Sequence, residues 1–240
     1  MPQSLSFGAP FLQFLWAAMY AEEPLGAPKN CIWTRQISVS LQWIATFLKE
    51  QKGDMHRRFT IEAFRGRGPI VSMCFDASPW GAGGFLVVDG VLISWFATAF
   101  TSADEKAVGM TFGTSTSQQV AEALAILFGL RAWLQAWLGG SPLLQLRSDS
   151  VSALTLVARM KTSSPSLAIV AREMALTLSA SCVRPCVVEH TPGAANKLAD
   201  LLSRRFQPGT TWSIPHALKH IAECMIPPRG AGYYRCAGGQ

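Results

Sequence analysis

The sequence predicts an α/β fold built on one mixed sheet of five strands, with helices on both faces of the sheet. Three short apolar runs follow one another at Ile70–Asp76, Gly81–Val88 and Val91–Ala97, a pattern typical of an antiparallel meander. From residue 120 onward helical and strand patterns alternate, which is typical of parallel strands covered by helices. We therefore expect three antiparallel strands followed by parallel ones.

Turn residues delimit the first three strands. Asp89-Gly90 is a strong signal for a two-residue hairpin between the second and third runs. The glycines at the start of the second run, Gly81, Gly83 and Gly84, allow another backbone to approach closely. After the third strand, Thr98–Gln119 reads as a long polar loop, and a loop of that length is usually mobile or functional.

The second half of the domain begins with a long apolar helix at Val120–Leu138, which Gly139, Gly140 and Pro142 terminate. Two further strands are expected, at Leu143–Arg147 and Pro185–Glu189. The remaining helices are expected at Val151–Met160, Ser166–Ala180 and Asn196–Arg205.

Segments of different character flank residues 70–206. Residues 1–69 read as a helical lead-in, with helices over Ser4–Tyr20 and Ile37–Lys49. A basic stretch follows these helices and either tracks a phosphate backbone or is a solvated face; its arginines are Arg57, Arg58, Arg65 and Arg67. Residues 207–240 read as a tail with one short helix, at Pro215–Cys224.

Composition narrows the class of protein. Hydrophobic residues make up 49% of the 240 residues and charged residues 15%, which predicts a folded chain. The net charge of +6 suits a polyanionic partner, although it is modest for this length. No stretch reads as a membrane span or a secretory signal, and the six scattered cysteines indicate a reducing compartment. We expect an intracellular protein, with cytoplasm and nucleus both open, and no small-molecule cofactor.

Four carboxylates lie on four elements of this predicted fold. Asp76 ends the first strand, Glu122 lies in the first turn of the long helix, Asp149 follows the fourth strand, and Asp200 lies within the last helix. Adjacent parallel strands end at the same edge of a sheet, so Asp76 and Asp149 are expected side by side. The helices that carry Glu122 and Asp200 can direct their side chains at the same point.

The surroundings of these carboxylates favour a divalent metal. Asp76, Glu122 and Asp200 are embedded in apolar runs, where an unpaired charge is costly. Like charges gathered in one pocket raise one another's pKa unless cations neutralise them, and all-oxygen ligands favour Mg²⁺, with Mn²⁺ as a substitute. Two such ions, roughly 4 Å apart, suit hydrolysis of a phosphodiester.

Each carboxylate also has an ordinary structural interpretation. Asp76 fits a turn, Asp149 a helix N-cap, Glu122 the first turn of a helix, and Asp200 an i,i+4 ion pair with Arg204. These interpretations are about as good as the functional one for any single residue. All four together, in this order and on these element types, are much harder to obtain by chance.

Three motifs resemble the ribonuclease H family. Asp76–Gly81 (DASPWG) resembles its first-strand aspartate and glycine turn, and Ser148-Asp149-Ser150 resembles its "TDS" motif. The run His190–Arg204 (HTPGAANKLADLLSR) is the most specific, and is similar to the ending of retrotransposon (LTR/gypsy-like) ribonuclease H domains. The resemblance covers roughly residues 70–206. Residues 31–70 resemble the connection of a reverse transcriptase and Ser4–Tyr20 a shortened polymerase thumb, without a polymerase catalytic motif.

The resemblance implies an endonuclease that cleaves the RNA strand of RNA–DNA hybrids with two Mg²⁺ ions, joined to the polymerase portion of a reverse transcriptase. It implies that His190 assists proton transfer or product release. The implied metal ligands are Asp76, Glu122, Asp149 and Asp200, and the implied substrate-binding residues are Ser78, Gln118, Gln119 and Asn196. The 50 residues between Asp149 and Asp200 leave no room for the basic handle of the free-standing cellular enzymes.

Two alternatives stay open at this stage. The domain is either active or a catalytically inactive module that binds nucleic acid or supports a polymerase. A DNA strand-transfer enzyme of the same fold, an integrase or transposase, is the other rival. Those enzymes usually take their third carboxylate from a late helix, so the position of Glu122 between the first two aspartates favours the hydrolase.

Overall fold

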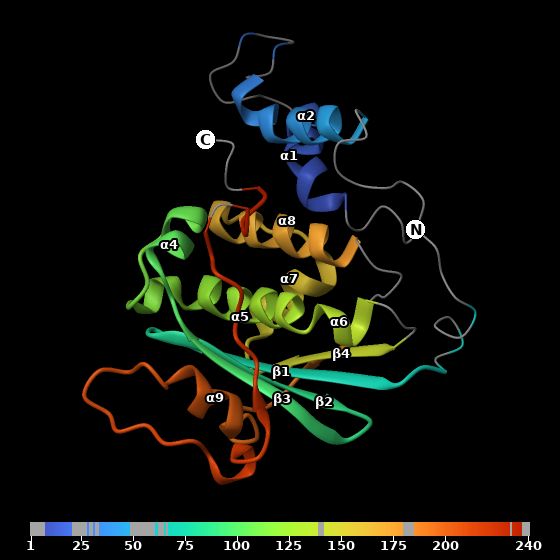
Figure 1. The fold of residues 1–240 in the computed structure, drawn as a ribbon. Coiled ribbons are helices and arrows are strands. Elements are labelled where there is room, and N and C mark those ends of the chain that lie inside the picture. The colour runs from blue at the N-terminus through green and yellow to red at the C-terminus, as the bar shows by residue number, and fades with distance from the viewer. Residues whose placement is uncertain are drawn as a thin grey trace.

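The computed structural model describes residues 8–20, 28, 31, 34–48, 61, 65, 67–138, 142–179, 185–230 and 232–236. Within these ranges a mixed sheet of six strands carries helices on both faces (Figure 1). The predicted fold class is confirmed: three antiparallel strands lead into parallel ones. One strand was not expected, and it comes from the C-terminal tail.

The sheet has the order β5-β4-β1-β2-β3-β6. β1 pairs antiparallel with β2, and β2 with β3, while β4 and β5 extend the sheet in parallel from β1. β6 pairs in parallel with Ser94 and Trp95 at the opposite edge. The strands are β1 Ile70–Ser78, β2 Gly81–Val88, β3 Val91–Ala99, β4 Leu143–Ser148, β5 Pro185–His190 and β6 Ala222–Glu223.

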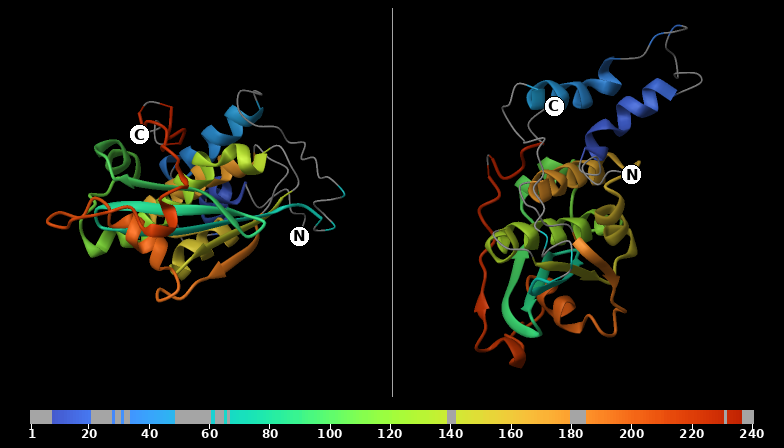
Figure 2. Two further views of the ribbon diagram at one scale, coloured as in Figure 1. Left: turned by 60° about the horizontal axis from the view of Figure 1, so that its bottom comes forward. Right: turned by 90° about the vertical axis from the view of Figure 1, so that its right-hand side faces the viewer.

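Helices cover the two faces unequally. One face is covered by a layer that includes α5, α7 and α8, and the short helix α9 lies on the other face, against β1 and β2 (Figures 1 and 2). The helices of this domain are α4 Ser102–Val108, α5 Gln118–Ala132, α6 Leu134–Leu138, α7 Val151–Arg159, α8 Pro165–Ser179 and α9 Lys197–Ser203.

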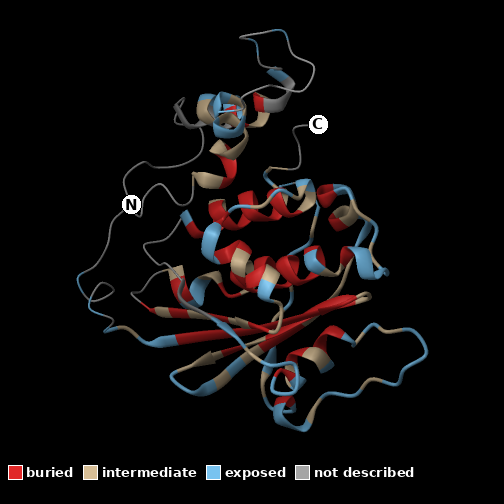
Figure 3. Ribbon diagram, turned by 180° about the vertical axis from the view of Figure 1, so that it is seen from behind, coloured by how far each residue is buried: buried red, intermediate tan, exposed pale blue. Residues whose placement is uncertain are grey.

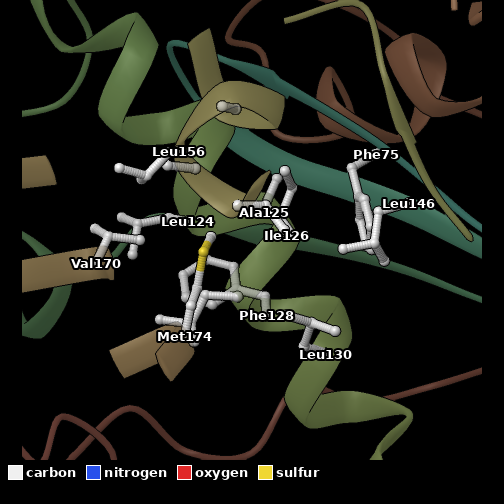
Figure 4. Packing of buried hydrophobic residues seen from close by; sticks show 14 of the residues in the cluster. Phe75, Leu124, Ala125, Ile126, Phe128, Leu130, Leu146, Leu156, Val170 and Met174 are labelled. Atoms are coloured by element: carbon white, nitrogen blue, oxygen red, sulfur yellow. The ribbon is translucent and has the colours of Figure 1, made fainter. Parts of the chain in front are cut away.

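The central helix α5 is buried on all sides. Every residue from Val120 to Leu130 is buried, because the sheet lies on one side of the helix and α7 and α8 lie on the other. Figure 3 shows this layer and the facing sheet as the most buried part of the fold. In Figure 4, Phe128 of α5 lies beside Met174 of α8, and Phe75 and Leu146 rise from the sheet. A helix that is apolar all round is stable only between two such layers.

Two segments differ from the sequence prediction. The expected loop 98–119 contains α4, which begins with a capping box in which Thr101 and Asp104 bond each other's backbone N–H. The expected helix Val120–Leu138 is broken at Trp133 into α5 and α6. The capping residues Thr101 and Asp104 are a helix-start pattern in the sequence. However, α4 is only seven residues long and lies among polar residues, so its sequence is hard to distinguish from a polar loop.

The C-terminal tail follows a different course from the predicted helix at Pro215–Cys224. A 3-10 turn, His216–Leu218, is followed by β6. The tail then crosses the helical layer (Figure 1), where Arg229 pairs with the fully buried Asp104 at 2.9 Å and the Tyr233 carbonyl accepts a hydrogen bond from Arg131. Local sequence patterns do not predict these contacts, because the residues involved lie far apart in the chain.

The N-terminal segment contributes two helices, α1 Ala9–Tyr20 and α2 Thr34–Leu48. They pack on each other, and α1 also contacts α8 (Figure 1). The Ser40 hydroxyl donates a hydrogen bond to the Phe11 carbonyl across this pair. None of the helices in the described ranges is both long and apolar enough to cross a membrane.

A close contact between α5 and β1 yields a stability prediction. A Cβ at Gly129 would lie 2.1 Å from Cε1 of the buried Phe75 ring. Overpacking of this kind costs about 1–3 kcal/mol, more than the ~1 kcal/mol that Ala gains over Gly in a helix. We expect Gly129→Ala to lower the free energy of unfolding, measured by urea denaturation.

Gly230→Ala is the matched control, because no atom lies within 4 Å of its Cβ position. Its effect should stay within about 0.5 kcal/mol. A Gly129→Ala variant as stable as the wild-type protein would show that α5 does not pack this closely on β1.

Candidate functional site

Three carboxylates from three elements meet at one end of the sheet. Asp76 lies near the end of β1, Asp149 follows β4, and Glu122 lies in the second turn of α5. Because β1 and β4 are parallel, with Phe75 opposite Ser148, the next residue of each strand falls side by side. One carboxylate oxygen from each of the three lies within 4.8 Å of the others. We call these three residues the carboxylate trio.

The trio is largely removed from water. Asp76 is 5% exposed and Glu122 7% exposed, and Asp149 is half-buried. Glu122 Oε2 and Asp149 Oδ1 are buried and have no hydrogen-bond partner in the described part of the chain. A buried, unpartnered carboxylate oxygen is costly unless a cation or a proton compensates it.

The pKa values of two of these carboxylates also show that their charged forms are unfavourable. Burial raises the pKa of Asp76 to about 7 against the opposing hydrogen bond from Ser203, and the charges of Asp149 and Asp200 contribute to the rise. Burial and then the charge of Asp76 raise the pKa of Glu122 to about 9. Like charges at this distance favour protonation, and a bound divalent cation would reverse that preference.

Two further side chains hold the buried carboxylates. The Ser203 hydroxyl, which is fully buried at the end of α9, lies 2.6 Å from Asp76 Oδ2 and donates to it. The Gln118 amide donates to Glu122 Oε1 at 2.7 Å and to the Ala77 carbonyl at 2.6 Å. Sequence analysis did not single out Ser203, although it follows Asp200 by one helical turn within the motif already identified.

Asp200 lies outside the carboxylate trio. Its Oδ1 accepts a hydrogen bond from Arg204 Nε at 2.7 Å, the i,i+4 ion pair that the sequence allowed as an alternative. Both side chains are nearly half exposed, so the pair is weakly held. Asp200 is nonetheless near enough for its charge to raise the pKa of Asp76.

The four residues implied as substrate-binding occupy different environments. Ser78 is buried and its hydroxyl donates to the Ser203 carbonyl at 2.7 Å. Asn196 is also buried, and its amide donates to the Phe75 carbonyl at 2.9 Å. These two contacts tie α9 to β1. Gln118 faces the trio, whereas its neighbour Gln119 is exposed.

The loop between β5 and α9 borders the site. His190 is the last residue of β5 and is exposed. It lies opposite Ser148, the residue that precedes Asp149. A Cβ at Gly193 would lie 3.4 Å from Asp149 Oδ2, so this loop passes directly beside that carboxylate. His190 is thus at the rim of the site and accessible to a substrate.

Of the basic stretch, Arg57 and Arg58 lie outside the described residues. Arg65 and Arg67 are described and exposed, shortly before β1 begins at Ile70. β1 runs from Ile70 toward Asp76, so Arg67 precedes the start of the strand and the trio lies near its far end.

The donor set fits a hard divalent cation. The trio supplies oxygen ligands from Asp76, Glu122 and Asp149, and two of these oxygens are buried with no partner in the described part of the protein. Oxygen-only ligands suit Mg²⁺ or Mn²⁺. Such an ion would be held by these three residues at the end of β1 and β4.

The pKa shifts predict how stability depends on pH. An unfolded Asp or Glu loses its proton near pH 4, whereas Asp76 does so at about 7 and Glu122 at about 9. Between these values the folded state binds more protons than the unfolded state, so stability of the metal-free protein falls as pH rises from about 4 to about 9. We expect the midpoint of thermal unfolding to fall over that range in EDTA.

Added Mg²⁺ should raise the midpoint most at high pH, because the ligands must be deprotonated to bind it. The Glu122→Gln variant serves as control and should show a shallower fall with pH. A midpoint in EDTA that is independent of pH between 5 and 9 would contradict the raised pKa values.

Comparison with known protein families gives a match for the second half of the domain. Residues 102–206 match the model of a family described as reverse transcriptase-like. The matched region runs from α4 to just beyond α9 and includes Glu122, Asp149 and Asp200. Searches of the curated proteins and of the solved structures found no match to the chain. The family match, together with the mixed sheet and its acidic end, supports a ribonuclease H-like domain of nuclease type in this chain.

Proposed function

We propose that this chain hydrolyses the RNA strand of RNA–DNA hybrids with two Mg²⁺ ions, for which Mn²⁺ can substitute, as part of a retroelement reverse transcriptase. The observation that carries the proposal is the carboxylate trio, two of whose buried oxygens find no hydrogen-bond donor among the residues that the structure describes. The match to the reverse transcriptase-like family supports the same reaction class.

Each residue has a distinct part in the proposed reaction. Asp76, Glu122 and Asp149 hold the metal ions, and Asp200 joins them when its exposed ion pair with Arg204 opens. Mg²⁺ held by these carboxylates would lower the pKa of the attacking water and stabilise the leaving oxygen. His190, exposed at the rim, moves a proton or aids release of the product.

Substrate recognition in this proposal rests on shape. An RNA–DNA hybrid presents a wide minor groove with 2′-hydroxyls, which proteins contact with little sequence preference. The exposed Gln119, in the first turn of α5, is available to that groove, whereas the buried Ser78 and Asn196 act on substrate only through the position of α9.

The polymerase portion of the reverse transcriptase is the proposed partner. Residues 70–206 would form the nuclease, with 1–69 as thumb- and connection-like sequence and 207–240 as a tail. The spacing between Asp149 and Asp200 leaves no room for a basic handle, so affinity for the hybrid has to come from elsewhere. The exposed Arg65 and Arg67, with the rest of their basic stretch, are the proposed backbone contacts.

A second candidate function has one observation in its favour. Asp200 is paired with Arg204 and lies outside the trio, as expected of a catalytically inactive module that binds nucleic acid or supports a polymerase. Cleavage of a labelled RNA–DNA hybrid by the purified chain in Mg²⁺ or Mn²⁺ separates the two candidates.

The first functional prediction concerns Asp76. The Asp76→Asn variant should lose hybrid cleavage by at least about 100-fold, because a metal ligand is removed from the centre of the trio. Rates are measured on a labelled hybrid with Mg²⁺. Asp89→Asn, a like substitution in the β2–β3 turn, is the control and should keep the wild-type rate. Retained cleavage by Asp76→Asn would refute the assignment.

The second prediction tests the fourth carboxylate. If Asp200 supports metal binding only after leaving Arg204, then Asp200→Asn should reduce hybrid cleavage less than Asp76→Asn does. Its fold should be unchanged, because an exposed ion pair contributes little, about 0–1 kcal/mol. Equal rates for Asp200→Asn and the wild-type protein would exclude Asp200 from the site.

A further inference from the structure

The hydrogen bonds within the acidic site follow a pattern that the proposed reaction does not explain. Asp76 has Oδ2 bonded to the Ser203 hydroxyl, and Glu122 has Oε1 bonded to the Gln118 amide. Within the described ranges, the second oxygen of Glu122 is buried without a hydrogen-bond partner, and so is one oxygen of Asp149. Asp76 and Glu122, the two most buried members of the trio, are therefore each fixed through one carboxylate oxygen.

We propose that Ser203 and Gln118 are positioning residues that each hold one oxygen of Asp76 and Glu122, so that the other oxygen of each would be available to a metal ion. The inference rests on the proposed function for its metal, and assigns Gln118 a role other than the groove contact that the sequence suggested. Neither side chain is a metal ligand here; each acts through the carboxylate that it holds.

The placement of Ser203 supports this role. Its single hydroxyl proton has two acceptors in reach, Asp76 Oδ2 at 2.6 Å and the Asp200 carbonyl at 2.9 Å. The carboxylate is the stronger acceptor and the nearer one. Ser203 itself is held in place, because its carbonyl accepts from Ser78 and a Cβ at Gly83 would lie only 2.6 Å from its backbone nitrogen.

The contacts of Gln118 define the orientation of its amide. Both of its partners, the Ala77 carbonyl and Glu122 Oε1, are hydrogen-bond acceptors, so the amide nitrogen must face them. Both amide protons are then used. Gln118 links the start of α5 to β1 one residue beyond Asp76, and it has no donor left for a base.

Hydrogen bonds to metal-ligating side chains typically account for 10–100-fold in metal affinity. Removing either bond should leave the carboxylate free to rotate, and its burial should change little. A residue with a purely structural role would lower stability without this loss of affinity.

The test is titration calorimetry of the full chain with Mn²⁺ alone, using matched pairs of variants. Ser203→Ala and Gln118→Met should each weaken Mn²⁺ binding about 10-fold. Ser72→Ala removes another buried hydroxyl, near the start of β1, which bonds Gln145 of β4. Gln135→Met makes the same change as Gln118→Met at an exposed glutamine of α6. Both controls should bind Mn²⁺ as the wild-type protein does.

Hybrid cleavage gives a second readout. A positioning role predicts a lower kcat with an unchanged KM for Gln118→Met, because the metal site is affected and groove contact is not. A raised KM with normal Mn²⁺ affinity would overturn the inference and return Gln118 to substrate binding.

The outcomes separate this inference from the proposed function. Unchanged Mn²⁺ affinity in both variants, with normal cleavage by the wild-type chain, overturns the positioning role and leaves the nuclease intact. Loss of affinity in both variants, in a chain that cleaves no hybrid, supports the positioning role and refutes the nuclease. A wild-type chain that binds no Mn²⁺ overturns the inference outright.

Discussion

The arrangement of this domain depends on holding like charges together out of water. Asp76 and Glu122 are both buried, and a carboxylate oxygen of Asp149 lies within 4.8 Å of an oxygen of each. Such a group is unfavourable unless protons or cations neutralise it, as the raised pKa values of Asp76 and Glu122 show. The fold therefore has to supply enough packing energy elsewhere to keep these carboxylates in place.

That packing comes from the layer above the sheet. α5 is buried from Val120 to Leu130, and Gly129 lets it approach the ring of Phe75, the residue that precedes Asp76. Contact between this helix and β1 therefore fixes the distance between Glu122 and Asp76. On the opposite face, Asn196 bonds the Phe75 carbonyl and Ser203 bonds Asp76, so α9 holds the same strand from below.

The C-terminal tail strengthens the helical layer at a distance from the site. Glu173 and Asp104 are both fully buried, and their partners are Arg131 of α5 and Arg229 of the tail. The Cys236 backbone N–H also donates to Glu173. Buried ion pairs of this kind contribute little net stability when intact, but loss of one partner is strongly destabilising. Removal of Arg229 would therefore leave the buried Asp104 without its ion-pair partner and should destabilise the helical layer.

The sequence by itself determined the order and type of the main elements, because long apolar runs and the Asp89-Gly90 turn are local signals. It also indicated four carboxylates, three of which the structure brings together, while their catalytic role stays a prediction. Tertiary structure decided the rest. The pairing of β6, the break at Trp133 and the hydrogen bond from Ser203 to Asp76 were not predicted from local patterns. The sequence left two interpretations of Asp200 open, and the folded structure pairs it with Arg204, outside the trio. A local sequence pattern shows which polar groups a segment carries. The folded structure decides which hydrogen-bond or ion-pair partner each polar group reaches, because burying a polar group without a partner is costly.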